Sequence, residues 1–276
     1  MTSNVGFALL LSLLAGLSTG IGSAIAYFMR RPKSGYMSLI LGFSGGVMIY
    51  VAFAELLHSA IEKIGFGVSN LVFFGGIAFI MMVDLFIPHE YKNEDAGHSF
   101  SPLIRSRKTT RQLVKTNTAH NVDQSSRLMR AGILAAIGIA IHNFPEGLVT
   151  FSSGLTGDKA FGILVAAAIA IHNIPEGISV SIPIMQATGN RNRAFFYSFF
   201  AGLAEPLGAL LGYVVLFNFL TPTLIYTLMA FAAGIMVYIT LDEILPTAHM
   251  YGEEHLVIIG TALGMLLMAV SIFLLL

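Results

Sequence analysis

The sequence predicts an all-α integral membrane protein with eight transmembrane helices in a 3+2+3 inverted-repeat arrangement, and three observations lead to this fold class. Of the 276 residues, 55% are hydrophobic and only 11% are charged, whereas a typical soluble domain carries about 25% charged residues. The hydrophobic residues form eight long runs, each of roughly the 20 residues that a helix needs to cross a bilayer. Several of these runs also match one another in sequence.

The eight runs are expected to form one transmembrane domain over the whole chain. The first run is too long for the core of a signal peptide and lacks a basic leader, so we expect it to be retained as a span. A polar segment at 88–128 is expected to be a flexible cytoplasmic loop, because it is poor in large apolar residues. We place the spans near 5–29, 37–59, 69–87, 129–151, 160–185, 193–218, 222–247 and 255–276.

The basic residues predict the orientation. With eight spans, thirteen of the 15 Lys and Arg residues fall on one side of the membrane, and only Lys63 and Lys159 fall on the other. The positive-inside rule then places both termini on the non-cytoplasmic side of a cell (inner) membrane. The net charge is zero and no basic patch indicates nucleic acid binding, while the absence of cysteine excludes disulfides and thiolate metal sites.

Spans 4 and 5 contain two copies of one motif. Ala131–Gly147 and Phe161–Gly177 match at a shift of 30 residues, and each contains Ile-Ala-Ile-His-Asn-x-Pro-Glu-Gly. Consecutive spans are antiparallel, so the two copies run in opposite directions. A fainter match pairs spans 1–3 with spans 6–8, for example Ala15-Gly16-Leu17 with Ala201-Gly202-Leu203. Inverted repeats with a site at their interface are typical of transporters. A gene duplication without a present role would explain the repeats, but not the costly polar residues within them.

These polar residues form the predicted metal site. His142 and Glu146 share one helix face, and so do His172 and Glu176, because each pair is four residues apart. Imidazole nitrogen and carboxylate oxygen suit zinc and also iron(II), manganese or cobalt. The neighbouring Asn143 and Asn173 can add amide oxygens, and Pro145 and Pro175 free the carbonyls of Ile141 and Ile171. The alternative is a structural His–Glu pair at each helix kink.

Further acidic residues lie in other spans. Glu205 precedes Pro206 within span 6 and is expected to be a ligand, against the alternative of a hydrogen-bonded structural acid. Its counterpart in span 1 is Thr19, so the site is expected to be asymmetric. Residues nearer the span ends either line the ion path or cap helices, and these are Glu55, His58, Asp242 and Glu243. The sequence shows no partner for Asp84.

The doubled motif His-Asn-x-Pro-Glu-Gly resembles that of the ZIP (Zrt/Irt-like) metal transporters. The resemblance extends over nearly the whole chain and includes residues 73–77, 201–208 and 241–246. It implies uptake of divalent metal into the cytosol, with zinc, iron(II), manganese, cobalt and cadmium as substrates. It also implies one metal position at His142, Glu146, His172 and Glu176, and a second at Asn143, Glu146, Asn173, Glu176 and Glu205.

The sequence therefore predicts a divalent metal transporter rather than an enzyme, with no cofactor and with metal ions and the lipid bilayer as its partners. No nucleotide-binding motif is present, so ATP is not expected to drive transport directly. Two alternatives stay open: an intramembrane metalloenzyme, in which the same residues hold a catalytic metal, and a metal-selective channel. The enzyme is disfavoured because a His-Glu-x-x-His motif is absent and two inverted copies do not fit one catalytic centre. The sequence leaves monomer and homodimer open.

Overall fold

The computed structural model describes residues 4–29, 33–86, 110–214 and 221–275, and every regular element in these ranges is a helix. Eight helices in the described residues are long and apolar enough to cross a membrane, which confirms the predicted all-α membrane protein with eight spans. Their bounds are Val5–Phe28, Ser34–Ile64, Phe66–Leu85, Ser125–Leu155, Lys159–Thr188, Arg191–Val214, Pro222–His249 and Glu254–Leu274.

Some spans consist of more than one element. The elements in chain order are α1 (Val5–Phe28), α2 (Ser34–Tyr50), η2 (Val51–Leu57), α3 (His58–Ile64), α4 (Phe66–Leu85), α5 (Thr110–Leu155), α6 (Lys159–Thr188), α7 (Arg191–Gly202), α8 (Ala204–Val214), α9 (Pro222–Ile239), η3 (Thr240–Ile244), α10 (Leu245–His249) and α11 (Glu254–Leu275). The two η elements are π-helical turns, which widen the helix locally and are frequent at functional sites.

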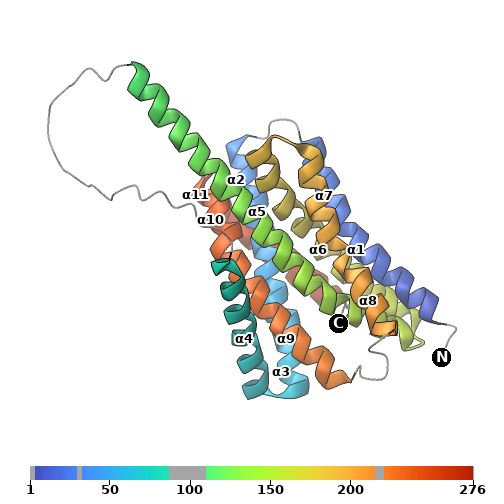
Figure 1. The fold of residues 1–276 in the computed structure, drawn as a ribbon. Coiled ribbons are helices and arrows are strands. Elements are labelled where there is room, and N and C mark those ends of the chain that lie inside the picture. Colours follow the sequence, from blue (N-terminus) through green and yellow to red (C-terminus); the bar gives the residue numbers. More distant parts are fainter. Residues whose placement is uncertain (1–3, 30–32, 87–109, 215–220, 276) are drawn as a thin grey trace.

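Helix α5 begins at Thr110, inside the segment 88–128 that we expected to be a loop. The stretch from Thr110 to Arg130 contains neither Gly nor Pro, so nothing in it interrupts a helix. At 46 residues, α5 is roughly 70 Å long, and its first turns extend away from the helix bundle (Figure 1). Residues 87–109 lie outside the described residues, and the flexibility expected for the loop stays a prediction.

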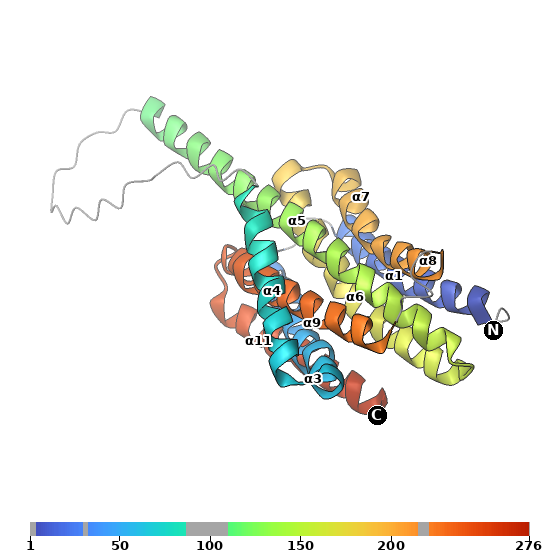
Figure 2. The same ribbon diagram turned by 60° about the horizontal axis from the view of Figure 1, so that its bottom comes forward.

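The helices pack in two groups. One group contains α1, α5, α6, α7 and α8, with the most extensive contacts between α1 and α6 and between α5 and α6. In the second group, α2 packs along α11 and α4 packs along α9. Figures 1 and 2 show the two groups side by side in both views, with α5 and α9 at the boundary. The 3+2+3 inverted-repeat arrangement stays a prediction.

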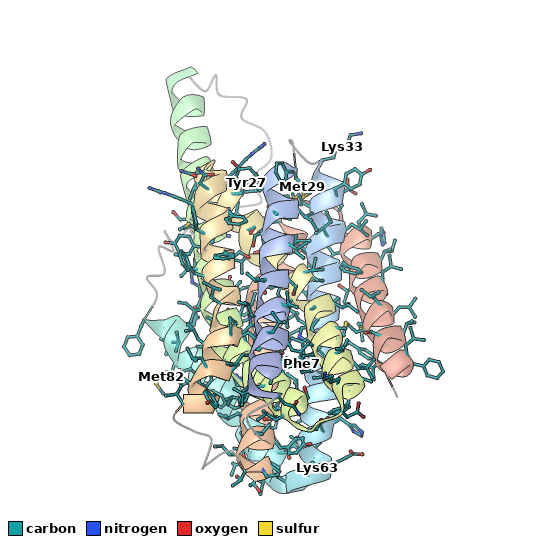
Figure 3. The ribbon with its side chains drawn as sticks, turned by 90° about the vertical axis from the view of Figure 1, so that its right-hand side faces the viewer. Phe7, Tyr27, Met29, Lys33, Lys63 and Met82 are labelled. Carbon is teal, nitrogen blue, oxygen red and sulfur yellow. The ribbon has the colours of Figure 1, made fainter. Side chains whose placement is uncertain are left out.

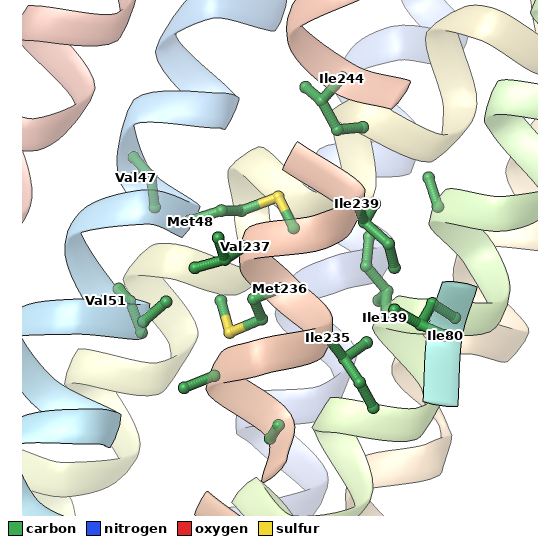
Figure 4. Close-up of a cluster of buried hydrophobic side chains, with 14 of the residues drawn as sticks. Val47, Met48, Val51, Ile80, Ile139, Ile235, Met236, Val237, Ile239 and Ile244 are labelled. Carbon is green, nitrogen blue, oxygen red and sulfur yellow. The ribbon is translucent and has the colours of Figure 1, made fainter. Parts of the chain in front are cut away.

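A cluster of buried apolar side chains joins the two groups. It contains Val47 and Met48 of α2, Ile139 of α5 and Ile235 of α9, all of which are fully buried (Figure 4). The surface of the bundle is apolar as well, and Phe74 of α4 is 61% exposed. An apolar exterior around a packed interior is the pattern that a lipid environment requires.

Basic residues lie at the two ends of the bundle as the orientation argument assumes. Figure 3 places Lys33 and Met29 at one end and Lys63 at the other. Arg191 donates to the carbonyl of Met29 at 3.4 Å, so it belongs to the Lys33 end. Which end faces the cytoplasm stays a prediction.

A proline divides the sixth span. Helix α7 ends at Gly202 and α8 begins at Ala204. Pro206 has no N–H and therefore leaves the carbonyl of Gly202 without its helical donor. The interruption places Glu205 in the first turn of α8, in the interior of the bundle.

Candidate metal centre

Helices α5 and α6 bring the two copies of the motif together. Each histidine faces the glutamate of the other helix: His142 Nε2 lies 2.9 Å from Glu176 Oε1, and His172 Nε2 lies 3.3 Å from Glu146 Oε1. All four side chains are at most 3% exposed. The pairing is thus between helices, and neither histidine pairs with the glutamate of its own motif.

Many polar atoms of this cluster lack a hydrogen-bond partner, although all of them are buried. They are His142 Nδ1, Asn143 Oδ1, both oxygens of Glu146, both ring nitrogens of His172, Asn173 Oδ1 and Glu176 Oε2. The His172 and Glu146 atoms are close but not aligned for a hydrogen bond. A buried polar atom without a partner costs about 1–3 kcal/mol. A divalent cation, for which these nitrogens and oxygens are suitable donors, would satisfy several of them at once.

Asn173 and Glu205 extend the cluster toward α1 and α8. The side-chain amide of Asn173 donates to Glu205 Oε2 at 2.7 Å and to the carbonyl of Ala15 at 3.0 Å. Glu205 Oε1 accepts from the Thr150 hydroxyl at 3.2 Å, and Glu205 is fully buried. Asn143 donates to the carbonyl of Ala201 at 3.4 Å. The carboxylate of Glu205 is therefore held in place by its neighbours and still has lone pairs for a cation.

Two glycines allow the helices of the centre to approach closely. A side chain on Gly147 would collide with the backbone oxygen of Glu205, and one on Gly177 would collide with the backbone oxygen of Thr19. Each glycine follows a glutamate of the motif. The absence of a side chain is thus what lets α8 and α1 lie directly against α5 and α6 beside the candidate ligands.

Of the residues predicted to line the ion path, Glu55 lies near the centre and His58 does not. Glu55 is in the π-helical turn η2 and interacts electrostatically with His172 and Glu146. Its Oε2 atom is buried without a hydrogen-bond partner. His58 is instead on the surface of α3, where it lies 3.4 Å from Glu62.

A second group of acidic side chains lies toward the Lys33 end. Oxygens of Asp84, Asp242 and Glu243 lie within 4.8 Å of one another. Arg130 of α5 pairs with Asp84 and lies 3.3 Å from Glu243, and Tyr238 donates to Asp84 at 3.3 Å. In the sequence, Arg130 counts only as a basic residue of the loop side, and Asp84 shows no partner. The one sequence signal that Arg130 lies in the interior is its position within the predicted span 129–151.

Arg130 precedes His142 by twelve residues, which corresponds to about 18 Å along α5. The structure therefore separates three acidic regions along the bundle: Glu55 in η2, the His–Glu cluster in the middle, and the Asp84–Asp242–Glu243 group. Such a series of carboxylates can attract a cation and replace its hydration shell in steps.

The chain is similar to known proteins over nearly its whole length. The sequence profile of a family described as ZIP Zinc transporter matches residues 5–272. Three similar curated relatives each bear the name Zinc transporter ZupT. The protein from Nitratidesulfovibrio vulgaris is 49% identical and the alignment covers 98% of both chains. The protein from Clostridium perfringens is 46% identical over 99% of this chain and 97% of the relative. The protein from Chlorobium luteolum is 48% identical over 99% of both chains.

Proposed function

We propose, from the premise that this chain belongs to the ZIP family of zinc transporters, that it takes up zinc through a metal centre between α5 and α6. The chain is a multi-pass membrane transporter and not an enzyme.

The observation that carries the proposed site is the crossed pairing of two buried His–Glu motifs. His142 with Glu176, and His172 with Glu146, offer two imidazoles and two carboxylates from facing helices. A structural ion pair would not leave so many donor atoms without partners in the same place. We infer that His142, Glu146, His172 and Glu176 form one metal position, and that Asn143, Asn173 and Glu205, with the two glutamates as bridges, form the second.

The proposed path runs from the Lys63 end to the Lys33 end. The distribution of basic residues supports a cytoplasmic Lys33 end and both termini on the opposite side. Glu55 would then receive the ion on the outer side of the centre. Asp242 and Glu243, with Asp84, would receive it on the inner side. His58 is too far toward the surface of α3 for a direct role, although it can attract cations to the entrance.

We propose a carrier rather than a channel. A channel needs a continuous wet path, whereas His142, Asn143, Glu176 and Glu205 are all 0% exposed. A fully enclosed site instead requires the helices around it to move so that each side of the membrane gains access in turn. The division of the bundle into two packed groups supports movement of one group against the other.

Zinc is the proposed principal substrate, since the relatives are named zinc transporters. We propose iron(II), manganese and cobalt as further substrates because the ligand set contains only nitrogen and oxygen donors, which these divalent ions accept. Cadmium is proposed as well, because the resemblance to the ZIP family implies it. Zinc uptake in competition with each ion would rank them.

The test is zinc uptake by proteoliposomes that contain the purified protein. The wild type should accumulate zinc saturably, and Glu146→Ala and Glu176→Ala should each abolish accumulation. Exposed Glu253→Ala serves as the matched control and should transport zinc as the wild type does. Uptake that persists in both centre variants would show that the ion crosses elsewhere.

A further inference from the structure

The hydroxyl group of Thr19 is buried in the middle of α1 without a hydrogen-bond partner. Thr19 is fully buried. Among the Ser and Thr residues in the part of the chain that the structure describes, only Thr19 and Ser69 have a buried hydroxyl without a hydrogen-bond partner. A helical threonine ordinarily donates to the carbonyl one turn before it, as Thr240 and Thr261 do here. Thr19 therefore departs from the usual behaviour of its residue type.

The backbone carbonyl one turn before Thr19 already accepts hydrogen bonds from other side chains, one of which belongs to the candidate metal centre. It belongs to Ala15, which accepts from the Asn173 side chain at 3.0 Å and from the Ser18 hydroxyl at 2.6 Å. Asn173 also donates to Glu205, so this face of α1 contacts the centre directly. The Thr19 hydroxyl is consequently available for another group.

Two further contacts place Thr19 at the centre. Its backbone oxygen lies against Gly177, the residue after Glu176. Its Cβ and Oγ1 atoms lie 2.6 and 2.9 Å from the position that a side chain on Gly202 would occupy. Gly202 follows Ala201, whose carbonyl accepts from Asn143. The backbone of Thr19 thus lies against the residue that follows Glu176, and its side chain lies against Gly202, next to the carbonyl that accepts from Asn143.

Thr19 occupies the same kind of position as Glu205. The backbone oxygen of Thr19 faces Gly177 of α6, and that of Glu205 faces Gly147 of α5. Four residues earlier, the carbonyl of Ala15 accepts from Asn173, as that of Ala201 does from Asn143. One side of the centre therefore carries a carboxylate where the other carries a neutral hydroxyl.

We propose that the Thr19 hydroxyl holds a water molecule of the substrate ion on the α1 side of the centre, opposite Glu205, and thereby sets the affinity for zinc. This inference rests on the proposed function. Zinc takes nitrogen, sulfur and carboxylate ligands in proteins rather than hydroxyl groups, so Thr19 acts through water, and such a bridge is nearly as favourable as a direct hydrogen bond. A fourth carboxylate here would hold the ion more tightly, whereas a retained water leaves one ligand that exchanges easily.

Thr19→Val tests the proposal because it replaces the hydroxyl by a methyl group of nearly the same size. Loss of a group that supports a metal ligand lowers metal affinity by about 10–100-fold. We therefore expect the zinc Kd of the purified protein in equilibrium dialysis to rise at least about tenfold. In proteoliposomes, KM should rise by the same factor and kcat should stay unchanged, because binding is lost uniformly. Thr19→Ser should bind zinc within about twofold of the wild type.

A purely structural role predicts different results. Thr261→Val is the matched control, because its hydroxyl bonds within α11, and it should leave the zinc Kd unchanged. Without zinc, Thr19→Val should melt at or above the wild-type temperature, since it removes an unpartnered hydroxyl from the interior. The proposal is overturned if Thr19→Val binds zinc as the wild type does, or if Thr19→Ser is as defective as Thr19→Val.

Glu176→Gln separates this failure from failure of the proposed function. If Glu176→Gln keeps wild-type zinc binding, the centre itself is wrong and the inference about Thr19 falls with it. If Glu176→Gln loses zinc while Thr19→Val retains it, the centre stands and only the inference about Thr19 is refuted.

Discussion

Replacement of Glu176 by glutamine separates the contribution of this side chain to the fold from its contribution to zinc binding. Glu176 Oε1 lies 2.9 Å from His142 Nε2, and both side chains are 0% exposed. Glutamine is nearly isosteric and still offers an oxygen to His142. It removes the negative charge and replaces one of the two carboxylate oxygens, of which Oε2 has no hydrogen-bond partner.

The effect on the metal-free protein should be small. A hydrogen bond to a charged group contributes about 1.5–3 kcal/mol and a neutral one about 0.5–1.5 kcal/mol. Glu176→Gln should therefore lower the free energy of unfolding by about 1 kcal/mol. Glu176→Ala would leave His142 buried without a partner, and breaking a buried pair in this way costs about 3–5 kcal/mol.

The effect on zinc binding should be much larger. Changes to residues that only support ligands already lower metal affinity by about 10–100-fold, so loss of a direct carboxylate ligand should lower it by more than about 100-fold. At a free zinc concentration of about 100 times the wild-type Kd, zinc stabilises the wild type by about 2.7 kcal/mol. A hundredfold weaker variant gains only about 0.4 kcal/mol from the same concentration.

The assay is thermal unfolding in detergent with and without zinc, together with equilibrium dialysis. Glu62→Gln is the matched control, because it changes the exposed His58–Glu62 pair, whose atoms lie 3.4 Å apart. Exposed pairs of this spacing contribute only about 0.3–0.5 kcal/mol, so the control should keep the full response to zinc. A wild-type zinc response in Glu176→Gln would refute the assignment of Glu176 as a ligand.

Three further predictions concern packing, the inner acidic group and orientation. Gly147→Ala should destabilise the protein by about 1–3 kcal/mol through overpacking against Glu205, and it should reduce zinc uptake. Gly75→Ala is the control, because a side chain there meets open space, and it should change neither the stability in thermal unfolding nor the uptake in the transport assay. Arg130→Met should lower the melting temperature by several degrees, because Asp84 and Glu243 lose a shared partner. Arg193→Met, which changes an exposed basic residue, is the comparison, and equal melting temperatures of the two variants would contradict the interpretation. The chain has no cysteine, so Lys63→Cys should react with an impermeant maleimide on intact cells and Lys33→Cys should not; the reverse pattern would invert the proposed orientation.

Much of this protein could be predicted because a bilayer restricts the chain so strongly. Backbone groups in lipid must be paired within the chain, so each long apolar run had to be a helix, and eight such runs are confirmed. The start of α5 was missed because the polar residues from Thr110 onward indicate solvent but do not exclude a helix. The partner of Asp84 was missed because Arg130 lies 46 residues away along the chain.

The sequence by itself determined the residue types of the candidate centre and their placement on two helix faces, since spacing of four residues has only one geometric meaning in a helix. Only the tertiary structure decided which groups meet. The pairing of His142 with Glu176 and of His172 with Glu146, instead of pairing within each motif, follows from how α5 and α6 cross. The unused hydroxyl of Thr19 follows from a hydrogen bond that Asn173 makes to another helix. Both depend on distances between distant segments, and these distances are set by packing rather than by local pattern.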